Sequence, residues 1–348
     1  MSTPPEPPAP AAGMPAHGRV VRRGDFVPAA WLPGRHLATI WASLCRRPPP
    51  VALQFEHLDL PDGDFLELAW TRPRAAPVVI VLHGLEGSHG SAYVRALLGL
   101  LDGAGLRGVL LQFRGCSGRP NRLDRSYHSG DTGDLDFLVR LVTARTGAPP
   151  CAVVGYSLGG NVTLKWLGEL GAAAPVQTAV AVSVPFDLGA CADYLDRGFS
   201  RLYQRRLVGS MRRKLEAKFG ARPAPLDLAG LHRLRSFRAF DNAVTAPLHG
   251  FRDAVDYYER ASCRPYLRHI RTPTLIVHAE DDPFVPRSAI PRAAELAPGV
   301  TLELTSAGGH VAFVTGRLPW RAQYWCEARI LAHLCDVIGV HPGAQRGG

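Results

Sequence analysis

The stretch 151–170 constrains the fold of this chain more than any other, because it joins a short apolar run, a serine between glycines and an amphipathic segment. Residues 152–154 have the length and β-branched content of a buried strand. Gly155–Gly159 then fits the G-x-S-x-G pattern of a nucleophile elbow, in which flanking glycines let strand and helix approach without Cβ clashes. The pattern predicts that the Ser157 hydroxyl is held at the carboxyl edge of a sheet. Apolar residues recur at helical spacing after the turn: Val162, Trp166 and Leu170.

Length and composition indicate a globular protein. A chain of 348 residues with 46% hydrophobic content can form one large α/β domain or two small ones. No run approaches the ~18 consecutive apolar residues of a membrane span, and the Pro/Ala-rich N-terminus does not resemble a signal peptide. We therefore predict a cytoplasmic location. The seven cysteines contain no C-x-x-C pair, which argues against a disulfide framework or a zinc site, and we expect neither a metal nor another cofactor.

The positive charge of the chain is concentrated in one segment. The formal net charge is +10, and between Arg197 and Phe240 ten Arg and two Lys are opposed only by Glu216 and Asp227, so this segment contains the whole excess. Such a cluster is most often a solvated helical face, and it lacks the interleaved aromatic residues that stack on bases. A nucleic acid partner is therefore not expected, whereas weak contact with an anionic membrane surface stays an alternative.

The order of segments predicts one domain with an insertion. Residues 1–24 are rich in Pro and Ala and are expected to be a disordered tail. Residues 25–348 are expected to form an α/β domain that starts with a hairpin over 53–70. Apolar strands then alternate with helical patterns, among them a helix expected near 288–296, and a last helix is expected from about Trp320 to Val337. This alternation predicts a doubly wound, mostly parallel sheet.

The alternation stops between about 185 and 270, where the sequence is mostly helical. We interpret this insertion as a lid over Ser157, because an acyl chain needs a water-poor apolar pocket that a bare sheet edge does not offer. Seven large residues at its start are expected to cover the chain: Phe186, Leu188, Tyr194, Leu195, Phe199, Leu202 and Tyr203.

Two further residues complete a candidate catalytic set with Ser157. A serine hydroxyl needs a histidine to take its proton and an acid to hold that histidine in the right tautomer. Asp282 and His310 each follow a predicted strand, so both are expected on loops at the sheet edge where Ser157 lies and where ligands bind in open parallel sheets. The chain order Ser, Asp, His is the order expected of an α/β-hydrolase.

Each partner has rivals in the sequence. Asp281 competes for the acid role, but the residue before a proline is biased to extended backbone, which favours Asp282. His310 is favoured by the Gly-Gly that precedes it and by its position beyond the acid; its rivals are His83, His278 and His128.

The negative oxygen of a tetrahedral intermediate also needs donors. The backbone N–H of Leu158, directly after the serine, is one candidate, and the N–H of Leu85 in the His-Gly-Leu turn is the second. For His83 itself we expect a structural role in that turn.

At this point the chain resembles a known family, the YheT-like α/β-hydrolases, also called the AB hydrolase 4 family. That family is related to the mammalian ABHD1/2/3 group and the plant EMB8-like proteins. The resemblance extends from about Phe26 to the last helix and implies a serine esterase or lipase-like hydrolase with Ser157, Asp282 and His310 as the charge-relay set. It rests on these stretches: His83-Gly-Leu-Glu-Gly87, Phe113-Arg-Gly-Cys-Ser-Gly118, residues 126–134, Gly155-Tyr-Ser-Leu-Gly-Gly-Asn161, Asp281-Asp-Pro-Phe284 and Gly308-Gly-His-Val311.

Three functions follow as hypotheses. The first is hydrolysis of carboxylic esters, with short or medium acyl groups or monoacylglycerol-like substrates, through an acyl intermediate on Ser157. The second is transfer of the acyl group to an alcohol, as the resemblance to ester-synthesising yeast members implies. The third, of another class, is a non-catalytic protein that binds nucleic acid or an anionic membrane through the basic segment.

Overall fold

A computed structural model describes residues 16–220 and 222–340 of the chain. Its core is a nine-stranded sheet in the order β1-β9-β8-β7-β6-β4-β5-β3-β2. The strands are parallel except at one edge, where β3 pairs antiparallel with both β2 and β5. The predicted doubly wound, mostly parallel sheet with an N-terminal hairpin is confirmed. The strands are Arg19–Arg22 (β1), Gln54–Asp59 (β2), Phe65–Trp70 (β3), Val78–Leu82 (β4), Arg107–Gln112 (β5), Ala152–Tyr156 (β6), Thr178–Val182 (β7), Thr274–Ala279 (β8) and Val300–Thr305 (β9).

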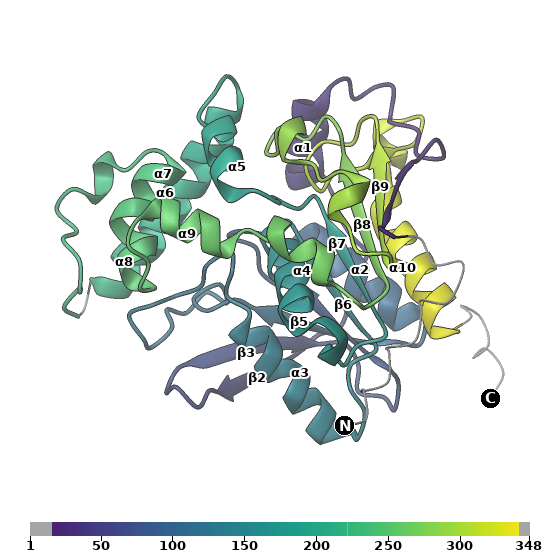
Figure 1. Cartoon of the computed structure of the whole chain (residues 1–348), viewed down its shortest axis with the longest axis horizontal. Helices are drawn as coiled ribbons and strands as arrows, with labels where there is room; N and C mark the ends of the chain where they lie inside the picture. Colours follow the sequence, from purple (N-terminus) through teal and green to yellow (C-terminus); the bar gives the residue numbers. More distant parts are fainter. Residues whose placement is uncertain (1–15, 221, 341–348) are drawn as a thin grey trace, which may run out of the picture.

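Helices cover both faces of this sheet (Figure 1). Ile80 and Leu82 of β4 belong to one core cluster, which includes residues of α3 (Gly133–Thr146) and α4 (Leu158–Leu170). Val79 and Val81 belong to a second cluster with residues of α2 (Ala92–Gly103) and α10 (Trp325–Ile338). Successive side chains of a strand point to opposite faces, so a continuous apolar run contributes to two cores at once.

A helical segment separates β7 from β8 and has an apolar core of its own, which includes Val208, Phe240 and Tyr257. Figure 1 shows this segment to one side of the sheet. No helix in the described ranges is both long and apolar enough to span a membrane. The helices of the segment are α5 (Leu188–Leu195), α6 (Ser200–Phe219), α7 (Phe237–Phe240), α8 (Ala246–Leu248) and α9 (Ala254–Ala261).

The positive charges of 197–240 do not form a single solvated face. Lys214 of α6 donates to Glu86 at 3.0 Å, and the buried Lys218 donates to the side-chain oxygen of Asn121 at 2.8 Å. Burial lowers the pKa of Lys218 to about 8. The expectation of a solvated helical face is therefore wrong for these two lysines, which anchor α6 to the rest of the domain.

The expected disordered tail over 1–24 is wrong in part. Residues 1–15 lie outside the described residues, but Arg19–Arg22 form β1, which pairs in parallel with β9. Val20 lies opposite Leu302 and packs against the core. Two valines are too short an apolar run to predict a strand. The hydrogen bonds that stabilise β1 come instead from β9, almost 300 residues further along the chain.

Two single-turn helices replace the helix expected near 288–296. They span Arg287–Ala289 and Ala293–Glu295. Pro291 lies between them, and a proline in a helix interior removes a backbone hydrogen bond and clashes with the preceding turn. The apolar spacing predicts one helix here, but Pro291 prevents a continuous one.

Candidate active site

Ser157 occupies the turn between β6 and α4. Its φ of 51° and ψ of −115° place it in a left-handed conformation that is strained for a residue with a side chain. The neighbouring glycines make room for the turn. A Cβ on Gly155 would lie 2.3 Å from the Gly159 carbonyl oxygen, and a Cβ on Gly159 would lie 2.7 Å from that of His83. The backbone at Ser157 therefore has the sharp turn that the elbow motif predicts.

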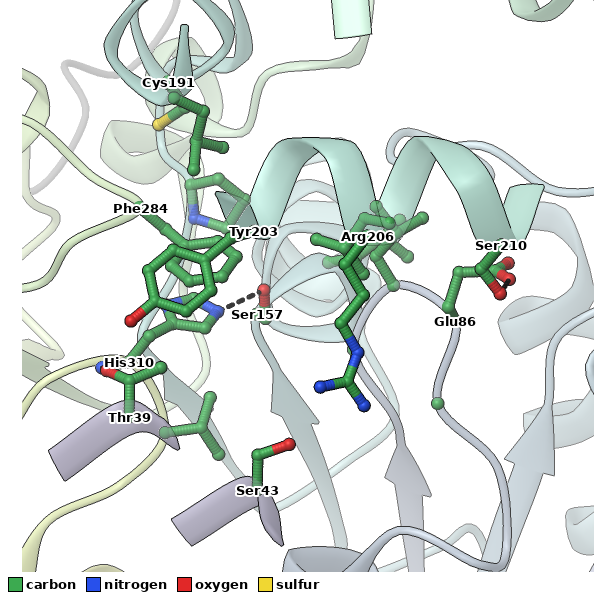
Figure 2. A pocket seen from close by; sticks show the side chains of 18 of the residues that line it. Thr39, Ser43, Glu86, Ser157, Cys191, Tyr203, Arg206, Ser210, Phe284 and His310 are labelled. Atoms are coloured by element: carbon green, nitrogen blue, oxygen red, sulfur yellow. Dashed lines mark hydrogen bonds between the residues drawn. The ribbon is translucent and has the colours of Figure 1, made fainter. Parts of the chain in front are cut away.

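His310 lies between Ser157 and Asp282. Its Nε2 is 2.9 Å from Ser157 Oγ, and its Nδ1 is 2.8 Å from Asp282 Oδ2; Figure 2 marks the first contact with a dashed line. A carboxylate only accepts hydrogen bonds, so Nδ1 donates to it, and Nε2 is left to accept from the serine hydroxyl. The structure thus brings the three predicted residues into one hydrogen-bonded chain.

Asp281 and Asp282 have different partners. The carboxylate of Asp282 is buried and also accepts from the Phe284 N–H at 2.7 Å. Asp281 accepts from the Gly309 N–H at 3.0 Å, and burial raises the pKa of its carboxyl group. Asp281 therefore holds the loop that precedes His310, whereas Asp282 contacts the imidazole. These contacts agree with the preference for Asp282 over Asp281.

Two residues that the sequence did not single out position His310. The Phe284 ring stacks on the imidazole, with ring centroids 4.0 Å apart and an interplanar angle of 13°. Thr39, on α1 (Arg35–Leu44), accepts from the His310 backbone N–H at 3.0 Å. Phe284 lies in the Asp-Asp-Pro-Phe stretch, so the motif offered a signal for it. Thr39 lies on a helix far from the motifs, and no pattern marks it.

The turn after β4 lies against Ser157. A Cβ on Gly84 would be 3.2 Å from the Ser157 Cβ, and both Leu85 and Leu158 line the same cavity as the serine hydroxyl. His83 Nε2 accepts from the Phe113 N–H at 3.1 Å, so Nδ1 carries the proton and donates to the Gly84 carbonyl at 2.7 Å. Burial lowers the pKa of His83 to about 4. These contacts agree with the structural role expected of His83.

The residue after Leu85 connects this turn to α6. Glu86 has a φ of 61°, and its buried carboxylate accepts from Tyr127 at 3.0 Å, Ser210 at 2.6 Å and Lys214 at 3.0 Å. Three donors therefore hold one carboxylate beside the Leu85 amide, and two of the three come from α6. Sequence reasoning missed this cluster because its members are separated by up to 128 residues.

A cavity of about 700 Å³ opens over Ser157 and His310. Figure 2 shows side chains from α1, α6 and the turn after β4 around it. A smaller cavity of about 200 Å³ adjoins it and shares Leu85 and Leu158 in its lining. Within the described residues, no group of three His, Cys, Asp or Glu side chains is arranged to hold a metal ion. The helical segment contributes these apolar and aromatic residues to the lining of the main cavity: Leu188, Ala192, Leu195, Phe237 and Tyr258.

The seven residues expected to cover an acyl chain divide into two groups. Leu188, Leu195 and Tyr203 line the main cavity. The other four do not: Phe186 is buried against His278, Tyr194 accepts from Arg35, and Phe199 and Leu202 are exposed beside a separate groove. The expectation is wrong for these four, because the helical pattern gives the apolar content of α5 and α6 but not which residues face the cavity.

Known proteins resemble the chain along most of its length. The family model for the alpha/beta hydrolase fold matches residues 77–317. A protein of Escherichia coli strain K12 named "Putative esterase YheT" is 43% identical over 312 residues, which cover 88% of this chain and 92% of that protein. Phospholipase ABHD3 of Mus musculus is 28% identical over 310 residues, with 86% of this chain and 75% of that protein covered.

The fold also matches solved structures. An esterase of Pyrococcus furiosus superposes with a TM-score of 0.52 at 16% sequence identity, covering 82% of this chain and 92% of that one. At this sequence identity the superposition shows a shared fold and nothing about function. Together with the family match and the likeness to YheT, it shows that the chain belongs to the α/β-hydrolase family, in the group that contains YheT and ABHD3.

Proposed function

We propose that this protein hydrolyses carboxylic esters through an acyl intermediate on Ser157. The observation that carries the proposal is the hydrogen-bonded chain from Ser157 through His310 to Asp282 in the wall of a 700 Å³ cavity. The names of the relatives, an esterase and a phospholipase, support the same reaction class. The apolar lining of the cavity supports an acyl group of short or medium length, or a monoacylglycerol-like substrate.

In the first half of the reaction, Ser157 Oγ attacks the ester carbonyl carbon while its proton passes to His310 Nε2. The resulting imidazolium is stabilised by the Asp282 carboxylate on Nδ1. When the tetrahedral intermediate collapses, the bond to the alcohol oxygen breaks and Nε2 returns the proton to that oxygen. The acyl group then remains as an ester of Ser157. In the second half, His310 takes a proton from water, the hydroxide attacks the acyl carbon, and Ser157 leaves with the proton.

The negative oxygen of both tetrahedral intermediates needs donors that are already in place. The amides of Leu158, at the first turn of α4, and Leu85 are proposed for this role. Removal of one such donor typically costs ~10²–10³ in turnover. The support is positional, since both residues line the cavity beside Ser157 and the Leu85 turn is held by the Glu86 cluster.

The experiment combines turnover with covalent labelling. Purified protein should release p-nitrophenol from p-nitrophenyl butyrate and should be labelled by a fluorophosphonate. Ser157→Ala and His310→Ala should each lower turnover by roughly 10⁴–10⁶-fold, and the double variant should be little worse, because the residues act as a unit. Circular dichroism checks that each variant is folded. A folded wild-type protein that neither turns over esters nor reacts with the probe would refute the proposal.

The same assay separates hydrolysis from acyl transfer. With ethanol added, hydrolysis predicts free acid as the main product, with ethyl ester no more abundant than partitioning in solution gives. A large excess of ethyl ester would assign acyl transfer instead.

A further inference from the structure

The lining of the main cavity includes charged side chains as well as apolar ones. One face of α6 contributes to this lining, at the spacing of three and four residues that puts side chains on one helix face: Tyr203, Arg206, Leu207, Ser210 and Arg213. Figure 2 shows Arg206 extending from α6 into the cavity, in the direction of Ser43 on α1. Arg206 and Ser43 are both exposed, so they lie toward the mouth of the cavity rather than against Ser157.

The charges around the cavity do not cancel. Arg46, the third arginine of the lining, is paired with Glu327 at 2.9 Å. The acids of the lining are also engaged, Glu86 by Lys214 and Asp241 by Tyr258 at 2.7 Å. Arg206 and Arg213 have no carboxylate within 4.0 Å among the residues that the structure describes.

We propose that Arg206, together with Arg213 two helical turns further along α6, forms a subsite for an anionic group of the ester substrate. The inference rests on the proposed ester hydrolysis and specifies its substrate class: esters that carry a phosphate or carboxylate in addition to the scissile bond. A guanidinium offers planar paired donors that match both groups, and the Ser43 hydroxyl offers one more donor on the facing wall. The oxyanion role is not the reason for the charge, because Arg206 stands at the mouth whereas Leu85 and Leu158 flank Ser157.

Matched pairs of esters test the subsite and locate the anion. p-Nitrophenyl heptanoate and the mono-p-nitrophenyl ester of pimelate differ by a carboxylate in place of the terminal methyl group on the acyl side, and the pimelate chain is too long for its carboxylate to attack the ester readily. 1-Hexanoylglycerol and its 3-phosphate differ only on the alcohol side. All four are used below their critical micelle concentrations, so that adsorption to an interface does not contribute. Wild-type protein should prefer the anionic member of one pair, and that pair identifies the side of the ester that faces Arg206.

The readout is the ratio of kcat/KM for the anionic ester to that for its neutral partner. Arg206→Gln should lower this ratio roughly tenfold or more, as expected for a lost charge-assisted contact, and Arg206→Lys should lower it less. Arg205→Gln is the matched control. It removes the same charge one residue away, at the separate groove beside Leu202, and should leave the ratio unchanged. Added salt should reduce the wild-type ratio, because exposed charges are screened.

Two outcomes would overturn the subsite: no anionic preference in an active wild-type enzyme, or equal ratios for wild type and Arg206→Gln. Binding gives a readout that does not depend on turnover. Calorimetric titration of Ser157→Ala with hexyl phosphate should show an affinity roughly tenfold weaker after Arg206→Gln is added. Retained phosphate binding in a protein that hydrolyses no ester would refute the proposed function and leave the subsite standing, whereas equal affinities would refute the subsite.

Discussion

Replacement of Asp282 by Asn should abolish most activity through the tautomer of His310. The Asp282 carboxylate accepts two hydrogen bonds, from the Phe284 N–H at 2.7 Å and from His310 Nδ1 at 2.8 Å. An Asn side chain has only one oxygen. If that oxygen keeps the Phe284 N–H, the NH₂ group faces Nδ1, and Nε2 then carries the proton and can no longer accept from Ser157.

The alternative orientation of the new amide is unfavourable. It would place the Asn NH₂ against the Phe284 N–H, and a buried donor left without an acceptor costs about 1–3 kcal/mol. The wrong tautomer of His310 therefore dominates by roughly 10-fold to 100-fold, before the loss of the charge that stabilises the imidazolium is counted. The lost charge adds to the tautomer effect, and we expect a combined loss of about 10⁴ in turnover, the size that the same change has in a serine protease triad.

The same substitution at Asp281 is the matched control. Asp281 accepts one hydrogen bond, from the Gly309 N–H, and the oxygen of an Asn can still accept it. Only the charge is lost, which weakens the bond by about 1 kcal/mol and should lower turnover by no more than roughly tenfold. The assay is kcat with p-nitrophenyl butyrate, with thermal unfolding as the check on stability. Equal losses, or a larger loss for Asp281→Asn, would refute this reasoning and transfer the acid role to Asp281.

Three other substitutions test separate parts of the site. Glu86→Gln removes the charge that holds Lys214 beside the oxyanion turn, so kcat should fall roughly 10-fold to 100-fold with little change in KM; an effect confined to KM would contradict the role. Ala192→Phe should lower the ratio of p-nitrophenyl octanoate to butyrate activity roughly tenfold, because it narrows the apolar part of the cavity, while fluorophosphonate labelling stays near that of wild type. His278 is fully buried, and burial lowers its pKa to about 4. The unfolded chain therefore binds a proton at this histidine below pH ~6.5 while the folded chain does not, and the folded state loses stability as pH falls from there toward 4. The unfolding free energy of His278→Leu in urea should therefore gain roughly 2 kcal/mol over wild type between about pH 7 and 5, and a pH-independent difference would refute the prediction.

The sheet could be predicted because burial on two faces leaves a strong mark in the sequence. β4 and β6 are apolar runs without polar interruption, and both strands are buried along their whole length. β1 could not be predicted in this way. It lies at the edge of the sheet with only Val20 and Val21 partly buried, so its existence depends on β9 and not on its own residues.

In the candidate site, too, the features that follow from buried strands could be predicted and those that depend on distant contacts could not. Ser157, Asp282 and His310 each follow a buried strand, and parallel strands bring their carboxyl ends to one edge, so their proximity follows from the order of elements. The contacts that orient them come from elsewhere. Thr39 reaches the His310 N–H across 271 residues, and Ser210 reaches Glu86 across 124. Such contacts depend on how α1 and α6 pack, and that packing has no local signature.

The position of α6 connects substrate recognition to the reaction centre. One face of this helix carries Arg206 into the cavity, and one turn further on Ser210 holds Glu86, which follows the proposed oxyanion residue Leu85. An anionic group bound by Arg206 would therefore fix the same helix that supports the Leu85 amide. Binding energy from a remote part of a substrate can be used in this way to raise kcat rather than only to lower KM. The pimelate ester should accordingly exceed the heptanoate ester in kcat if the anion lies on the acyl side, and this advantage should shrink in Glu86→Gln, in which the link between α6 and the turn is weakened. A difference in KM alone, unaffected by Glu86→Gln, would show that Arg206 recognises the anion without acting on the reaction centre.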